Sequence, residues 1–218
     1  MSPRPSTGAV AVTAAAALLA LTVWATADAS AQSVGTFTVA IDMSGATVGE
    51  RAARQIRTEL DRLWAPYGAT FTWSEGVSGL SEECTAVKVV FSDDEPGIKA
   101  RPGRRPLGIV YRVGDFWRRI IFVSPSAVMR LVRKSGAAPP ESFVMASLHA
   151  RMMARVIAHE LGHILLDTDG HAPRGLMRRG FKPADVVQHG RESFTLDPAE
   201  TERVARRCAA ASRAPAIR

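Results

Sequence analysis

The sequence predicts an α+β domain in which a β-sheet combines with one long helix and a C-terminal helix. Between residues 36 and 124, short segments with the two-residue alternation of strands are interrupted by one segment with helical spacing of apolar residues. Residues 143–157 form an apolar run without Gly or Pro, which favours a helix. Asp197 and Pro198 supply an N-cap and a first-turn residue for a final helix.

Five segments rich in β-branched and aromatic residues have the composition of strands. The fourth of them follows residues 92–106, whose content of Asp, Pro, Gly and Arg is typical of a surface loop. The predicted strands cover residues 36–41, 69–73, 86–91, 107–112 and 119–124.

Three segments have the pattern of helices. The first ends at Pro66, Tyr67 and Gly68, which stop a helix, and the second opens at residues 139–141, Pro-Pro-Glu. The Met residues of the second helix are interpreted as core. The predicted helices cover residues 50–65, 139 to about 166 and 198 to about 211, while residues 181–193 are expected to be irregular.

Residues 159–163 of the second helix read His-Glu-Leu-Gly-His. Helical residues four apart lie about 40° apart around the axis and about 6 Å apart along it, so His159 and His163 can bind one metal ion from one face. A catalytic Zn²⁺ takes three protein ligands and a water, and accepts neutral imidazole nitrogens. Glu160 can act as general base on that water without being a ligand. The motif therefore predicts zinc and a hydrolytic reaction.

The segment 156–177 resembles the metzincin clan of zinc peptidases, where the helix ends at a Gly, a third ligand follows, and a turn carrying a Met lies beneath the metal. This sequence has Leu166 at the position of the Gly and Asp169 at the position of the third ligand. The run from His171 to Met177 resembles the matrixin-like bacterial branch. The resemblance implies His171 as third ligand, with Asp169 as a neighbour that orients a ligand, and Met177 as the Met-turn residue. The alternative is Asp169 itself as third ligand, as in a small branch of the clan.

The resemblance also implies a mixed, mostly parallel twisted sheet with an antiparallel edge strand. Residues 107–112 would be the strand beside the cleft, to which a peptide substrate adds as one more strand. Residues 181–193 would form the wall of the specificity pocket. Relatives often bind calcium, for which Asp93, Asp94 and Glu95 are candidates, although three consecutive acids are usually a solvated surface.

The first 31 residues have the pattern of a secretory signal peptide. A weakly hydrophobic run separates Arg4 from Asp28, and small residues near Ala29 and Ala31 offer cleavage sites. We therefore expect a secreted, periplasmic or extracellular protein with one peptidase-like domain at residues 32–218, the alternative being an uncleaved membrane anchor. The predicted strand at residues 36–41 leaves no room for a propeptide.

The chain has a net charge of +7 at pH 7, and loss of residues 1–31 would remove one Arg and one Asp and leave this excess unchanged. The basic residues are dispersed and not interleaved with aromatic residues, so we expect a solvated exterior and no nucleic-acid partner. We expect a monomer. The two cysteines, Cys84 and Cys208, are a candidate disulfide in an exported protein.

The sequence thus predicts a secreted zinc metalloendopeptidase that acts on peptide or protein substrates. In it, zinc lies on His159, His163 and His171 (or Asp169), and Glu160 is the catalytic base. One alternative is a zinc-binding module of the same fold that binds or inhibits without turnover. Another is a zinc peptidase with a distant third ligand, Glu192 or Glu200, in which His171 would have no role.

Overall fold

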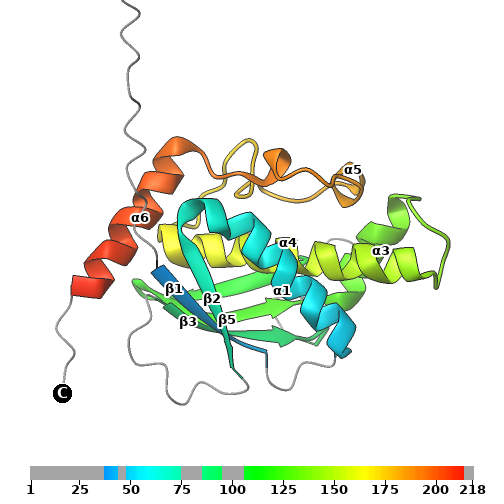
Figure 1. The fold of residues 1–218 in the computed structure, drawn as a ribbon, viewed down its shortest axis with the longest axis horizontal. Helices are drawn as coiled ribbons and strands as arrows, with labels where there is room; N and C mark the ends of the chain where they lie inside the picture. Colours follow the sequence, from blue (N-terminus) through cyan, green and yellow to red (C-terminus); the bar gives the residue numbers. More distant parts are fainter. Residues whose placement is uncertain (1–36, 44–47, 75–84, 95–105, 214–218) are drawn as a thin grey trace, which may run out of the picture. The chain divides into compact units, whose positions relative to one another are not determined.

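A five-stranded sheet forms one layer of the domain (Figure 1). The computed structural model describes residues 37–43, 48–74, 85–94 and 106–213, which belong to one compact unit, Ser33–Arg218. The strands are β1 (Phe37–Asp42), β2 (Ala69–Ser74), β3 (Thr85–Phe91), β4 (Gly108–Val113) and β5 (Phe116–Val123).

The strand order is β2-β1-β3-β5-β4, and every pair is parallel except the last. The edge strand β4 runs antiparallel to β5, in a register that places Ile109 opposite Phe122. The hairpin between them turns at Gly114, whose φ of 59° favours glycine. The prediction of a mixed, mostly parallel sheet with an antiparallel edge strand is therefore confirmed.

Helices α1 and α4 cover the same face of the sheet (Figure 1). Helix α4 is 24 residues long and is followed by a connecting segment with two short helical turns before the last helix. The helices are α1 (Glu50–Trp64), η1 (Ala65–Tyr67), α3 (Pro125–Lys134), α4 (Phe143–Leu166), α5 (Pro183–Val186), η2 (Glu192–Phe194) and α6 (Pro198–Arg213). Within the described residues, no helix is long and apolar enough to cross a bilayer.

The core lies between the sheet and helices α1 and α4. Each strand contributes alternate residues to it, such as Val87 and Val89 of β3, as the period of two requires. Full burial of one such aliphatic side chain stabilises the fold by about 1.5–3 kcal/mol. From α4, the residues predicted as core are all buried: Met145, Leu148, Met152, Met153, Val156 and Ile157.

Three parts of the chain differ from the sequence-based expectation. Helix α3 was not predicted, although Ser124 and Pro125 are an N-cap followed by a first-turn proline. Helix α4 starts at Phe143 rather than at residues 139–141, because Ser142 is its N-cap and Glu141 has a left-handed φ of 58°. The segment predicted as irregular contains α5 and η2.

Several predicted features lie outside the described residues. These are the N-terminal segment 1–31, Cys84 and Glu95. Cys208 lies in α6, but its side chain is not among those described. The signal peptide and the disulfide therefore stay predictions.

The start of α3 depends on a small network around Asp93. The Ser124 hydroxyl accepts a hydrogen bond from the Ala127 amide at 3.1 Å and donates one to the Asp93 carboxylate at 2.5 Å. The same carboxylate oxygen accepts from the Ser126 amide at 3.2 Å and the Ser126 hydroxyl at 2.9 Å. Asp93 thus joins the end of β3 to the first turn of α3. Its negative charge also interacts favourably with the positive end of the α3 dipole.

We predict that Ser124→Ala lowers the free energy of unfolding by about 1–2 kcal/mol, because it removes the helix cap and a buried partner of Asp93. For a domain of this size, that corresponds to a fall in melting temperature of about 2–8 °C, measured by circular dichroism. Thr58→Ala, which removes an exposed hydroxyl from the middle of α1, is the control and should leave the melting temperature unchanged or slightly higher. Equal melting temperatures for Ser124→Ala and the wild type would contradict the prediction.

Candidate metal centre

The C-terminal half of α4 holds two histidines one turn apart. His159 and His163 are 7% and 6% exposed, and their Nε2 atoms lie 3.2 Å apart. Two nitrogens about 2.1 Å from one tetrahedral ion would lie about 3.4 Å apart, so this separation suits a shared ion. The helical spacing that the sequence showed therefore brings the two rings together.

A left-handed residue ends α4 and turns the chain back toward His163. Asp167 has φ 52° and ψ 52°, and its amide donates to the His163 carbonyl. The Thr168 amide donates to the same carbonyl at 3.3 Å, and the Thr168 carbonyl accepts from Nδ1 of the His163 ring at 2.7 Å. Asp167, which makes this turn, directly follows Leu166. Leu166 is at the position where the metzincin clan, which this segment resembles, has a Gly.

The segment after the turn orients His159 in the same way. Nδ1 of His159 donates to the Leu176 carbonyl at 2.8 Å. Leu176 is itself held by a hydrogen bond from its amide to the Thr195 carbonyl at 2.9 Å. A carbonyl oxygen only accepts, so each ring has its proton on Nδ1 and the lone pair of Nε2 is available to a metal.

His171 completes a group of three histidines. The ligand nitrogens of His159, His163 and His171 all lie within 4.8 Å of one another, the one such group of potential metal ligands among the described residues. Asp169 lines the same cavity but does not belong to the group. The structure therefore brings His171 to the predicted position of the third ligand, and Asp169 adds a nearby negative charge that partly opposes the lowering of the pKa of His163 and His171.

The environment keeps the three imidazoles neutral. Burial lowers the pKa of His159 to about 4, and the hydrogen bond to Leu176 only partly opposes this. Burial also lowers the pKa of His163 and of His171 below the ordinary value. Neutral imidazole is the form that binds a divalent transition-metal ion, so the donor set fits such an ion.

Met177 lies directly beneath the motif helix. The residue is 1% exposed, and a Cβ built on Gly162 would lie 2.3 Å from its sulfur atom. Any side chain at position 162 would displace Met177 and with it the turn that carries Leu176. Met177 thus packs against the motif helix at Gly162, and this close contact explains the Gly of the motif, while the role of Met177 as Met-turn residue stays a prediction.

Glu160 lies between α4 and the edge strand. The strand backbone comes so close that a Cβ on Gly108 would lie 2.5 Å from Val156 Cγ1 and 3.1 Å from Glu160 Oε1. Burial raises the pKa of Glu160 to about 8, and a hydrogen bond from the Val110 backbone partly opposes this. A cation on the histidines would lower this pKa, because an opposite charge favours the carboxylate. With such a cation bound, the side chain would be an ionised proton acceptor in the same cleft as the three histidines.

The histidines open into a cleft with a volume of about 740 Å³. Trp117 stacks on His163 with ring centroids 5.8 Å apart, and Phe181 meets His159 edge-on at 5.9 Å. No motif in the sequence marks these two aromatic residues, since their contact with the histidines depends on the fold. Neither Glu192 nor Glu200 lines this cleft, whose lining residues include Leu107, Gly108, Ile109, Val110, Leu131, Lys134 and Arg179.

Comparisons of the sequence with protein-family models and with curated proteins found no match. The chemical character of the site therefore rests on its own residues. They are three neutral imidazoles that converge, one carboxylate beside them, and an open cleft along a sheet edge.

We predict that His171→Ala reduces zinc affinity at least about 100-fold, whereas Asp169→Ala reduces it about tenfold or less, because a neighbouring charge contributes less than a direct ligand. Zinc affinity is measured by competition with a chromophoric chelator, and zinc content by elemental analysis of the purified proteins. A loss of zinc in Asp169→Ala alone would make Asp169 the ligand. A wild-type protein that binds no zinc would contradict the metal site altogether.

Proposed function

We propose that the protein is a zinc-dependent endopeptidase with a metzincin-like, matrixin-like architecture. The single observation that carries this proposal is the convergence of His159, His163 and His171 beside Glu160 in a cleft open to substrate. Zinc is the preferred metal because three neutral imidazoles leave a coordination position open for catalysis.

When bound, zinc would supply a Lewis acid that lowers the pKa of water and polarises the scissile carbonyl. The role of Glu160 follows from its place in the cleft. Its carboxylate accepts the proton of the attacking water and passes it to the leaving amine nitrogen. Hydrogen bonds from His159 to Leu176 and from His163 to Thr168 keep both rings in one tautomer and orientation throughout.

The proposed substrate is an extended peptide that lies along β4. Residues 106–110 line the cleft next to Glu160, and β4 pairs with β5 on its other side. An extended peptide can add to such an edge through backbone hydrogen bonds, which bind any sequence, while side chains enter the cleft. This arrangement supports cleavage within polypeptide chains rather than action on small molecules.

The wider resemblance supports the same proposal. The mixed sheet with its antiparallel edge strand and the contact of Met177 with Gly162 are compatible with what the metzincin clan implies. The signal-peptide pattern of residues 1–31 supports an exported enzyme, secreted or periplasmic.

We predict that Glu160→Ala retains zinc and its melting temperature within a few degrees but lowers kcat/KM for peptide hydrolysis at least about 100-fold, because the general base is removed. Hydrolysis is measured on a library of fluorogenic peptides, and a zinc chelator should abolish it reversibly. Full activity of the Glu160→Ala variant would contradict this mechanism. A wild-type protein that binds zinc and a peptide but releases no product would instead indicate a non-catalytic binding module.

A further inference from the structure

The segment between α4 and α6 forms the cleft wall, defined here as residues 171–194, and its residues line two cavities. His171, Arg179, Gly180 and Phe181 line the cleft of about 740 Å³. Their neighbours line a second cavity of about 590 Å³ that shares no lining residue with the first: among them are Ala172, Arg178, Gln188 and Ser193. Four residues of the segment are buried in the core, Leu176, Met177, Val186 and Phe194, so the polar groups between them need partners of their own.

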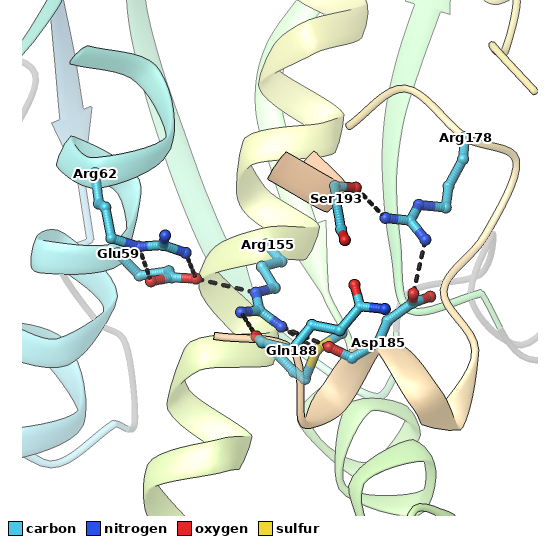
Figure 2. A network of polar contacts seen from close by, with 8 residues as sticks. Glu59, Arg62, Arg155, Arg178, Asp185, Gln188 and Ser193 are labelled. Atoms are coloured by element: carbon cyan, nitrogen blue, oxygen red, sulfur yellow. Dashed lines mark hydrogen bonds and ion pairs between the residues drawn. The ribbon is translucent and has the colours of Figure 1, made fainter. Parts of the chain in front are cut away.

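Arg155 ties this wall to α4. The side chain is fully buried, one helical turn before His159, and points from α4 toward the wall (Figure 2). Its guanidinium donates to the Asp185 carbonyl at 2.7 Å and to the Gln188 carbonyl at 2.5 Å. The group also lies 4.1 Å from the centre of the Phe194 ring. One buried cation thus contacts the wall at three places.

Glu59 of α1 neutralises this cation. Its carboxylate accepts from Arg155 Nε at 2.9 Å and from Arg62 in a two-point contact at 2.8 Å each (Figure 2). Burial lowers the pKa of Arg155, and the charge of Glu59 opposes this. Within the part of the chain that the structure describes, Arg62 shares the carboxylate, donates no hydrogen bond to the wall and interacts with it only through the charge of Glu192, which makes it a comparison for Arg155.

Arg178 lies within the wall and joins three of its parts. It donates to the Asp185 carboxylate at 2.7 Å and to the Ser193 carbonyl (Figure 2). It also donates to the Gly175 carbonyl at 2.9 Å. Asp185 also accepts from the Lys182 amide at 2.6 Å. Two arginines therefore meet at Asp185, one at its carbonyl and one at its carboxylate.

The position of the wall is transmitted to the histidines. Phe181 packs edge-on against His159, and its ring lies 6.1 Å from that of Phe194, over which both arginines lie. The Thr195 carbonyl, two residues beyond Ser193, holds the Leu176 amide, and the Leu176 carbonyl orients His159. A shift of the wall would therefore change the shape of the cleft beside the metal site.

We propose that Arg155, which ties the cleft wall to α4, and Arg178, which joins parts of the wall to one another, form a clamp that positions the wall and so determines which substrate side chains fit beside the metal site. They are positioning residues, since neither lines the cleft. The effect on substrate choice rests on the proposed peptidase function, whereas the positioning of the wall does not. Each guanidinium group donates to at least two backbone carbonyls at once. This requires the several N–H donors of an arginine and not only its positive charge.

The test compares Arg155→Met with Arg62→Met in the full mature protein. Each variant removes one of the two arginines that contact Glu59 and keeps the other. The buried carboxylate therefore retains a positively charged partner in both variants. Hydrogen exchange followed by mass spectrometry reports on residues 181–195, together with metal content. We expect exchange in that segment to become at least about tenfold faster in Arg155→Met and to stay unchanged in Arg62→Met, while both variants retain zinc.

With fluorogenic peptides, Arg155→Met should raise KM about tenfold or more, change kcat by less than about threefold and alter the preferred cleavage site.

Unchanged exchange of residues 181–195 in Arg155→Met, or equal changes in both variants, would overturn the clamp. Loss of zinc in Arg155→Met would also overturn it, because the arginine would then support the metal site itself. If Arg155→Met does not fold, Arg178→Met with the same measurements decides the question, since Asp185 keeps the Lys182 amide. If the wild type cleaves no peptide, the peptidase function fails while the exchange data still decide the clamp.

Discussion

The burial of α4 is the constraint on which the rest of the structure depends. From Met152 to Leu166 every residue of the helix is buried, so each polar side chain there needs a partner. Arg155 has Glu59 and two carbonyls, and the two histidines have Leu176 and Thr168. The polar groups of the candidate site are thus fixed in place by the same packing that stabilises the domain.

The floor and edge of the site depend on close approach of backbone to helix. At Gly162 the Met177 sulfur occupies the space of a side chain, and at Gly108 the edge strand lies against Val156 and Glu160. Dense packing at these two points sets the distance between the histidines, the turn below them and the strand beside them. A cleft then remains only where Trp117 and Phe181 flank the rings.

Local sequence patterns were enough for most of the fold. Alternation and strand composition identified all five strands within about three residues, and apolar spacing identified α1. The apolar run 143–157 identified α4, and the N-cap Asp197 with Pro198 identified α6. Helix α3 is absent from the sequence-based prediction because it is only ten residues long and its N-cap, Ser124, is also the last residue of the predicted strand 119–124. Its start is also fixed by Asp93, which lies 31 residues before Ser124 and outside the reach of a local pattern.

The sequence by itself determined the relation of His159, Glu160 and His163, because their spacing on one helix places them without any tertiary contact. The resemblance already favoured His171 over Asp169, but only the tertiary structure brings His171 to the other two histidines, since the direction of the chain after Leu166 depends on the left-handed turn at Asp167 and its hydrogen bond to His163. The partners of Arg155 likewise lie 30 or more residues away, at Asp185, Gln188 and Glu59. Contacts of that range form only when separate elements pack together, and no spacing along the chain encodes them.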